Sequence, residues 1–212
     1  MNSRFSRVKL LFGDDFEKLQ SKKILLLGVG GIGGFCLDSL YRTGVGSITI
    51  VDFDRFEITN QNRQIGSEDI GALKVDRMKE IYPKIDGYNL KITSLWVEKF
   101  DFEPFDLIID AVDDIPIKVS LAKKVSHKLI SSMGGAKRFD PTKIEIADIW
   151  KTYNDGLAKK FRSELKKIGF NKKFDTVFSS ELPNCKPLGS FVGVTGSFGL
   201  TLSSLAIKKI LI

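Results

Sequence analysis

A glycine cluster near the N-terminus has the spacing of a phosphate-binding turn. Gly28, Gly30 and Gly33 fit the pattern G-x-G-x-x-G, and Gly31 adds one more glycine to it. In such a turn one glycine permits the tight bend, one lets the backbone approach a phosphate, and one lets helix and strand pack closely. The pattern predicts a nucleotide phosphate at the N-terminus of the helix that follows. Taken alone, it does not say which nucleotide is bound.

Polar residues after the next apolar run indicate what is done with that nucleotide. Asp52 ends the run, at the place where a carboxylate holds ribose hydroxyls, and up to this point an NAD-dependent oxidoreductase fits equally well. The loop that follows brings together side-chain amides and fixed cations: Asn60, Asn62, Arg63, Gln64 and Lys74. Cations at this place neutralise the charge that builds on a phosphoryl group in its transition state. Hydride transfer needs no such cluster, so the loop favours a reaction at the polyphosphate of the bound nucleotide.

Two carboxylates follow another apolar run. Asp113 and Asp114 follow residues 105–111 after one intervening residue. The carboxyl ends of parallel strands face the ligand crevice of a doubly wound sheet. We expect Asp114 to cap the next helix and Asp113 to face the crevice, where its carboxylate would hold Mg²⁺ on the phosphates.

The elements that position these residues follow from hydrophobic patterning. Buried or alternating strands are expected at residues 24–27, 47–53, 90–97, 105–111, 128–132, 143–148 and 176–179. Helices are expected at residues 35–42, 73–82, 117–127 and 151–169, and at 4–20, where Leu10 and Leu11 would make apolar contacts. Strands that alternate with helices predict an α/β fold: a doubly wound, Rossmann-like, mainly parallel sheet with helices on both faces.

Composition limits the class of protein. At 212 residues and 42% hydrophobic content, the chain suits one domain with a substantial core. The formal net charge of +7 allows an anionic partner such as nucleic acid without requiring one. Cys36 and Cys185 lie far apart, so neither a disulfide framework nor a cysteine zinc site is expected. No apolar signal region is visible at the N-terminus, and we expect a cytoplasmic protein.

The uncharged segment at residues 189–207 is long enough to suggest a membrane span. It is interrupted by glycine, serine and threonine, which makes it too polar for a confident span. A buried helix that packs closely through its small residues is the better interpretation, and no membrane association is expected.

Five motifs occur in the order and spacing of one superfamily. They are Gly28-Val-Gly-Gly-Ile-Gly33, Asp52-Phe-Asp54, Asn60-Gln-Asn-Arg-Gln64, Gly71-Ala-Leu-Lys74 and Asp110-Ala-Val-Asp113. Over the first two-thirds of its length the chain resembles the E1-like adenylating enzymes, which activate ubiquitin-like and sulfur-carrier proteins. The resemblance implies ATP in place of NAD, with adenylation of a carboxylate and release of pyrophosphate.

The resemblance also implies roles for single residues. Gly31 would line the phosphates, Asp52 would hold the ribose, and Asp113 would serve the metal. Phosphate-directed roles fall to Asn60, Arg63 and Lys74. Arg7 matches an arginine that E1-like dimers insert into the neighbour's ATP site, which implies a homodimer.

Residues beyond 135 narrow the resemblance. The segments 138–151, 155–166 and 177–181 resemble the bacterial tRNA threonylcarbamoyladenosine dehydratases. The implied substrate is a modified adenosine beside the anticodon, whose threonyl carboxylate is activated as an acyl-adenylate before the carbamoyl group closes a ring. Residues 1–135 would form the nucleotide-binding core, and 136–212 the substrate-facing and dimer-packing portion. Basic residues of the second portion would meet tRNA phosphates: Lys159, Lys160, Arg162, Lys166 and Lys167. A solvated helix face is the alternative for this charge run.

Two further alternatives stay open on the sequence. The chain could instead activate the C-terminus of a ubiquitin-like sulfur carrier, together with a sulfur-transfer or cysteine desulfurase partner. The absence of paired C-x-x-C motifs and the basic stretch favour tRNA. Cys185 is a candidate nucleophile, because a cysteine forms a thioester or persulfide in this superfamily and Lys186 beside it favours the thiolate. Ring closure by intramolecular attack does not require such an intermediate.

Overall fold

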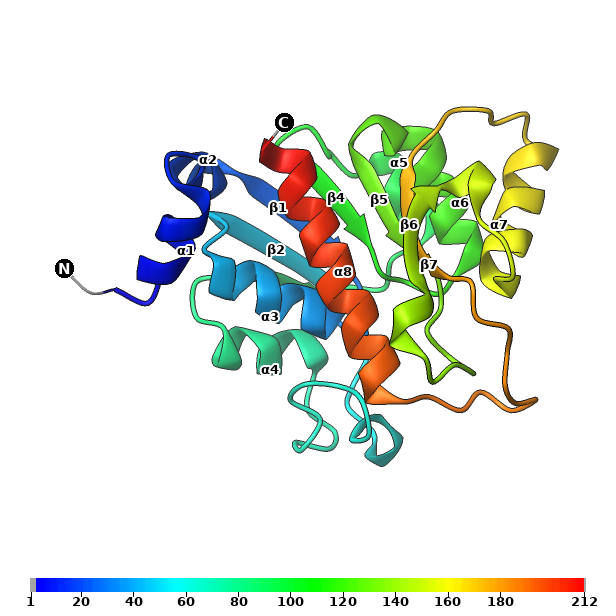
Figure 1. Cartoon of the computed structure of the whole chain (residues 1–212), viewed down its shortest axis with the longest axis horizontal. Coiled ribbons are helices and arrows are strands. Elements are labelled where there is room, and N and C mark those ends of the chain that lie inside the picture. The colour runs from blue at the N-terminus through cyan, green and yellow to red at the C-terminus, as the bar shows by residue number, and fades with distance from the viewer. Residues whose placement is uncertain (1–2, 212) are drawn as a thin grey trace.

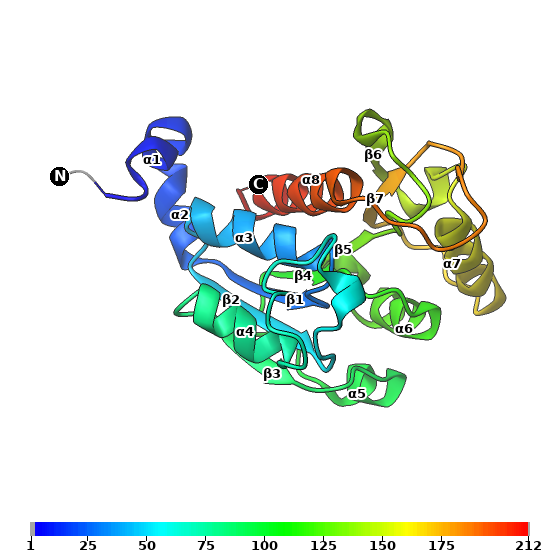
Figure 2. The ribbon, with the colours of Figure 1, turned by 90° about the horizontal axis from the view of Figure 1, so that it is seen from below.

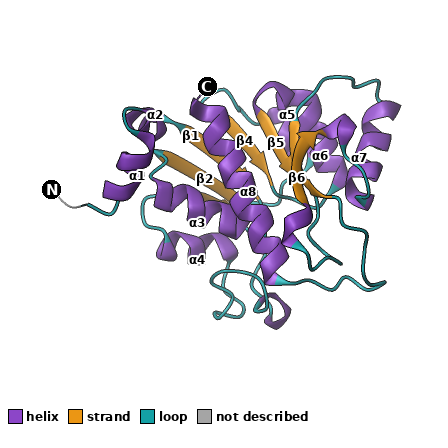
Figure 3. Ribbon diagram, in the orientation of Figure 1, coloured by secondary structure: helices purple, strands orange, loops and turns teal. Residues whose placement is uncertain are grey.

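The computed structural model describes residues 3–211 as one sheet covered by helices on both faces (Figures 1 and 3). Its seven strands lie in the order β3-β2-β1-β4-β5-β7-β6, and every neighbouring pair is parallel except β6 and β7. The strands are β1 (Lys23–Leu27), β2 (Ser47–Asp52), β3 (Asp86–Asn89), β4 (Leu107–Asp110), β5 (Leu129–Ser132), β6 (Ile144–Asp148) and β7 (Asp175–Ser179). The predicted Rossmann-like α/β fold is confirmed.

The helices form two layers, each with its own apolar core. The α-helices are α1 (Ser6–Phe12), α2 (Asp15–Ser21), α3 (Gly33–Thr43), α4 (Lys74–Ile81), α5 (Ser94–Lys99), α6 (Ile115–Val125), α7 (Gly156–Lys167) and α8 (Val192–Leu211). Helices α3, α4 and α8 share one core, and α5, α6 and α7 share the other. Figure 2 shows the two sets of helices on opposite sides of the sheet. After the exposed Lys23, the four remaining residues of β1 are apolar and buried between these cores, because the strand faces helices on both sides.

The strand order places a crevice beside the carboxyl end of β1. From β1 the chain runs to β2 and β3 on one side and then returns to β4 on the other. Such a reversal is the point where open α/β sheets bind their ligands. Leu27 pairs with Val51 on one side and with Asp110 on the other, so the segments after β1, β2 and β4 meet at one edge.

Two expectations about local structure were wrong. Residues 4–20 do not form one helix: Gly13, with φ of 55°, separates α1 from α2, and Leu10 and Leu11 are 87% and 77% exposed. The alternating residues 90–97 do not form a strand either. The Thr93 hydroxyl accepts a hydrogen bond from the Trp96 amide at 3.1 Å and starts helix α5 there. A helix cap outweighs a short alternating pattern because it supplies a partner for a free amide.

The glycine- and serine-rich C-terminal segment forms the buried helix α8, as predicted. Figure 1 shows it crossing the face of the sheet beside α3. A Cβ on Gly199 would lie 2.4 Å from the Ile32 carbonyl oxygen, so this contact requires glycine. Within residues 3–211, no helix has the combined length and apolarity that crossing a membrane requires.

Candidate active site

Two glycines of the turn after β1 are required by the fold itself. Gly28 has φ of 86°, and a Cβ there would lie 3.0 Å from the Ala111 carbonyl oxygen. A Cβ on Gly33 would lie 1.9 Å from the Gly28 carbonyl oxygen. The first glycine therefore makes the turn and the other lets helix α3 begin against it, as the motif predicts.

The two glycines between them are not required in this way. A Cβ on Gly30 would meet only the Gln64 side-chain amide at 3.8 Å, and one on Gly31 would touch the Arg63 stem at 3.2 Å. Neither contact involves the backbone of a core element. The bare backbone therefore leaves room for something outside the chain, and its position at the start of α3 suits an anion. Gln64 Oε1 is buried here and has no hydrogen-bond partner among residues 3–211.

Asp52 holds the turn in place. Its Oδ2 accepts from the Val29 amide at 2.8 Å, and its Oδ1 accepts from the Asp54 amide at 2.9 Å. The carboxylate thereby fastens the glycine turn to the loop that follows β2. Each oxygen keeps a second lone pair, which a ribose hydroxyl can use, so the ribose role stays a prediction.

The predicted phosphate-directed side chains come from this same loop. The Arg63 guanidinium donates to the Thr59 carbonyl and to Asn62 Oδ1, both at 2.8 Å, through Nη1 alone. Its stem lies against Gly31, and its Nε and Nη2 form no hydrogen bond with the described residues. Asn60 Oδ1 accepts from the Glu57 amide at 3.1 Å, which leaves the Asn60 amino group available.

Lys74 is nearly buried and already has an anionic partner. Its Nζ lies 2.9 Å from Asp54 Oδ2, and the Lys74 side chain is 6% exposed. This partner was not foreseen, although Asp54 belongs to the motif Asp52-Phe-Asp54. A phosphate that binds Lys74 would share its ammonium with Asp54. The ammonium can donate three hydrogen bonds, so it can contact both anions at once.

The two carboxylates after β4 differ in their contacts. Asp114 Oδ1 accepts from the Ile117 amide at 3.0 Å and caps α6, which confirms that part of the prediction. Asp113 is exposed and makes no hydrogen bond or ion pair with residues 3–211. No group of three metal-ligating side chains occurs among those residues. A lone free carboxylate fits Mg²⁺ all the same, because this ion is often held by one or two carboxylates together with substrate phosphates and water.

Arg7 does not belong to the site of its own chain. Phe5, two residues earlier, packs against Gly44 at the C-terminal end of α3, whereas the glycine turn lies at the other end. The 11 residues of α3 span about 16 Å at 1.5 Å per residue. Arg7 is exposed on α1, a helix with no buried residue. Its predicted role therefore requires a second copy of the chain.

Most of the predicted basic contacts lie on the surface of α7. Lys159, Lys160, Lys166 and Lys167 are all exposed, and Lys167 also pairs with Glu164 at 2.7 Å. Arg162 is half-buried and donates to the Thr152 hydroxyl. The surface that α7 offers to an anion therefore consists mainly of lysines.

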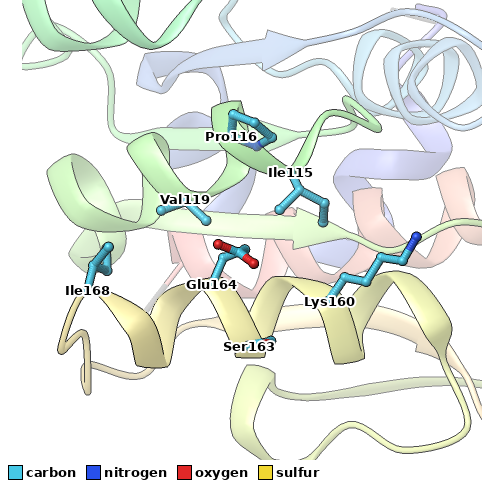
Figure 4. Close-up of a pocket in the computed structure, with 7 residues that line it drawn as sticks. All are labelled: Ile115, Pro116, Val119, Lys160, Ser163, Glu164 and Ile168. Carbon is cyan, nitrogen blue, oxygen red and sulfur yellow. The ribbon is translucent and has the colours of Figure 1, made fainter.

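A cavity of about 620 Å³ lies between the N-terminal part of α6 and one side of α7 (Figure 4). Ile115, Pro116 and Val119 line it from α6, and Lys160, Ser163, Glu164 and Ile168 from the other side. Its walls carry one cation and one anion and give no preference for a phosphate. We therefore place the nucleotide on the open glycine turn and not in this cavity.

The two cysteines differ in environment. Cys36 is buried in α3, where burial raises the pKa of its thiol. Cys185 is exposed, and its Sγ donates to the Pro187 carbonyl at 3.2 Å. The end of its loop is tied to the amide cluster, because Asn62 Nδ2 donates to the Ser190 carbonyl at 3.1 Å. Catalysis by Cys185 stays a prediction.

Arg138 joins three segments of the chain, a role that the sequence did not predict. Its guanidinium lies 3.0 Å from Asp155 Oδ2 and donates to the Gly134 carbonyl at 2.8 Å and the Glu181 carbonyl at 3.2 Å. It thereby joins the start of α7 and the loop after β7 to the chain that leaves β5. Nothing in the local sequence indicates that these segments meet.

The chain is similar along its whole length to one group of known proteins. The profile of the ThiF family matches residues 3–211. The chain is 41% identical to the tRNA threonylcarbamoyladenosine dehydratase of Bacillus subtilis over 195 residues, which cover 86% of this chain and 77% of the relative. It is 30% identical to the molybdopterin-synthase adenylyltransferase of Haemophilus influenzae, over only 63% of this chain and 59% of that one.

Solved structures show the same relationship. The crystal structure of the Escherichia coli tRNA N6-threonylcarbamoyladenosine dehydratase in complex with AMP superposes with a TM-score of 0.91, at 31% identity. The match covers 98% of this chain and 93% of that one. The same enzyme in complex with ATP gives the same TM-score of 0.91.

Proposed function

The chain belongs to the ThiF family, and on that premise we propose that it is an ATP-dependent tRNA threonylcarbamoyladenosine dehydratase. One observation carries the proposal. The glycine turn, Arg63, Lys74 and Asp113 converge on one edge of the sheet, within a fold that matches an ATP- and AMP-binding dehydratase from end to end. The chain is accordingly an adenylating enzyme that binds ATP.

The reaction has two bond-forming steps. First, the threonyl carboxylate of the modified adenosine attacks the α-phosphorus of ATP, and pyrophosphate leaves. Next, the carbamoyl group attacks the activated carbonyl within the same molecule, a ring closes and AMP leaves with one carboxylate oxygen. The net change is the loss of water from the nucleoside and the conversion of ATP to AMP and pyrophosphate. The second step needs little beyond positioning, because the reacting groups already share one molecule.

The protein's main task in the first step is to bring two anions together. We propose that Arg63 and Lys74 offset the charge that builds on the phosphates, with the Asn60 amino group as a further donor. Asp52 would hold the ribose, and Gly28, Gly30, Gly31 and Gly33 would keep the backbone close to the phosphates. Asp113 would hold Mg²⁺, which when bound supplies positive charge at the phosphates.

The second candidate acceptor is the C-terminus of a sulfur-carrier protein. The adenylyltransferase relative matches only part of the chain, whereas the dehydratases match it throughout, so tRNA is the better-supported acceptor. Incubation with ATP, Mg²⁺ and tRNA that bears threonylcarbamoyladenosine should release AMP and lower the mass of the nucleoside by that of one water, as mass spectrometry would detect. Unmodified tRNA is the control. AMP release that requires a carrier protein and leaves the nucleoside intact would contradict the proposal, and would also point to a sulfur-transfer partner and to Cys185.

We propose that residues 136–212 face the tRNA, chiefly through the exposed lysines of α7. Charge reversal of Lys159 and Lys166 to glutamate should weaken tRNA binding by about tenfold or more at low salt, because phosphate contacts supply much of the affinity. The affinity of the variant should also depend less steeply on salt concentration, because fewer counterions are released. The Michaelis constant for ATP should not change. Binding is measured by filter retention at several salt concentrations. The matched control reverses the exposed Lys99 and Lys208, which lie on other helices. Equal weakening by both pairs would favour the solvated-face alternative.

We also propose a homodimer in which Arg7 reaches the partner's site. Helix α1 buries none of its residues fully and leaves Leu10 and Leu11 exposed, so it offers an apolar surface that a second copy of the chain can cover. Replacing both leucines by glutamate should halve the mass seen in sedimentation velocity and reduce AMP formation. Leu95→Glu, at a residue 58% exposed on α5, is the control and should leave the mass unchanged. A parent protein that sediments as a monomer during turnover would refute the dimer.

A further inference from the structure

Helix α6 carries a lysine whose ammonium is completely buried beneath the site. Lys118 Nζ lies 2.8 Å from Asp110 Oδ2, 3.1 Å from Ser131 Oγ and 2.8 Å from the Ser132 carbonyl oxygen. The side chains of Lys118 and Asp110 are both 0% exposed. Three donors therefore meet three acceptors, and no proton of the ammonium is left without a partner.

Stability gives only a weak reason for this arrangement. Removing two charges from water costs several kcal/mol for each ion, and apolar residues of similar volume often fill such a place equally well. Neither charge is accessible to a ligand, so neither touches a reacting atom. A function for the pair must therefore be sought in what it holds in place.

The pair holds the segment that carries Asp113. At its start, Asp110 Oδ1 accepts from the Val112 amide at 3.2 Å. At its end, the Lys118 amide donates to the Asp114 carbonyl at 3.1 Å, within the first turn of α6. Between these points, the Ala111 carbonyl lies where a side chain on Gly28 would touch it. The Asp110 carboxylate therefore fixes the start of the segment, and the first turn of α6 holds its end. From this helix the Lys118 side chain reaches back to Asp110.

Ser131 ties the pair to the next strand. Its hydroxyl donates to Asp110 Oδ2 at 2.6 Å and lies beside the Lys118 ammonium. Rotation of the Asp110 carboxylate would break bonds to β5, to α6 and to the Val112 amide together. The orientation of the segment after β4 is therefore set by one connected network.

We propose that Lys118 is a positioning residue for adenylation, which acts through Asp110 to aim Asp113 at the bound nucleotide. The inference rests on the proposed function, because the role of Asp113 belongs to it. Lys118 takes no part in the chemistry, so its effect must pass through Asp113 and must vanish when Asp113 no longer works.

A double-mutant cycle tests this dependence. Lys118→Met combined with Asp110→Asn removes both buried charges and leaves no lone ion. We expect kcat for AMP formation to fall by about tenfold, with the Michaelis constant for tRNA unchanged. With Asp113→Asn already present, the same pair of changes should lower kcat by less than about twofold, since coupled residues are not additive. Lys123→Met, at an exposed lysine of the same helix, is the control and should leave kcat unchanged.

If the protein that carries Lys118→Met and Asp110→Asn does not fold, the cycle is repeated with Ser131→Ala. This change removes one bridging hydroxyl and leaves the ion pair intact. It should lower kcat by a few-fold, again only when Asp113 is present. If the fold-loss in kcat is the same with and without Asp113→Asn in either cycle, the inference is overturned and the proposed function still stands. If Asp113→Asn alone leaves kcat unchanged, the proposed role of Asp113 fails, and the inference fails with it.

Discussion

Replacing Arg63 by alanine should abolish AMP formation and leave the fold intact. The Arg63 stem lies against Gly31 of the glycine turn, and its own loop fixes the guanidinium through the Thr59 carbonyl and Asn62 Oδ1. A fixed cation of this kind lowers the barrier only when charge develops on the phosphates. Loss of one such group typically costs about 10² to 10³ in kcat. The rate is measured as AMP release with ATP and modified tRNA, and the melting temperature by circular dichroism.

The matched control is Arg42→Ala. Arg42 lies near the end of α3, is 70% exposed at its side chain and pairs with Asp38 at 2.7 Å. A surface pair of this type contributes about 0–1 kcal/mol, so both rate and melting temperature should stay close to the parent's. An Arg63→Ala enzyme that turns over at a rate within about threefold of the parent's would show that the phosphate assignment is wrong.

Alanine at Gly33 and alanine at Gly30 should fail in different ways. At Gly33 the new Cβ would lie 1.9 Å from a backbone oxygen, so the turn or helix α3 must shift. Overpacking of this kind costs about 1–3 kcal/mol or more, which lowers the melting temperature of a domain this size by about 2 to 12 °C. At Gly30 the new Cβ would meet only the flexible Gln64 amide at 3.8 Å, so the free protein should melt close to the parent's temperature.

The Gly30→Ala protein should nevertheless lose affinity for ATP by about tenfold or more, a change of about 1.4 kcal/mol. The methyl group would occupy the space that we assign to phosphate. Isothermal titration with ATP, beside thermal melts of both variants, separates the two effects. Tight ATP binding by Gly30→Ala would place the phosphates elsewhere, and a Gly33→Ala protein as stable as the parent would refute the packing account.

The parts of the fold that depend on short stretches of chain could be predicted. The glycine turn, the flanking strands and the Asp114 cap each follow from residues a few positions apart, where local sterics and hydrogen bonds decide the outcome. The Gly13 break and the Thr93 cap are also local, but each competes with an apolar pattern that pointed the other way. In both places a single backbone or capping requirement prevails over periodicity.

The side-chain partners within the site could not be predicted. Three ion pairs, Lys74 with Asp54, Arg138 with Asp155 and Lys118 with Asp110, depend on how helices are placed against the strands and loops around them. Hydrophobic patterns predict that strands are present, but they do not predict which polar side chains contact one another. The sequence therefore identifies the residues of the candidate site, and the structure alone shows which of them already have partners.

The fate of one oxygen atom tests the central proposal most directly. tRNA whose threonyl carboxylate carries a heavy-oxygen label is incubated with the enzyme, ATP and Mg²⁺ in ordinary water, and the released AMP is analysed by mass spectrometry. Adenylation of the carboxylate transfers one labelled oxygen to the phosphate of AMP, in step with cyclisation of the nucleoside. We predict one label per AMP. Unlabelled AMP released together with the cyclised nucleoside would contradict adenylation, and the account of this site with it.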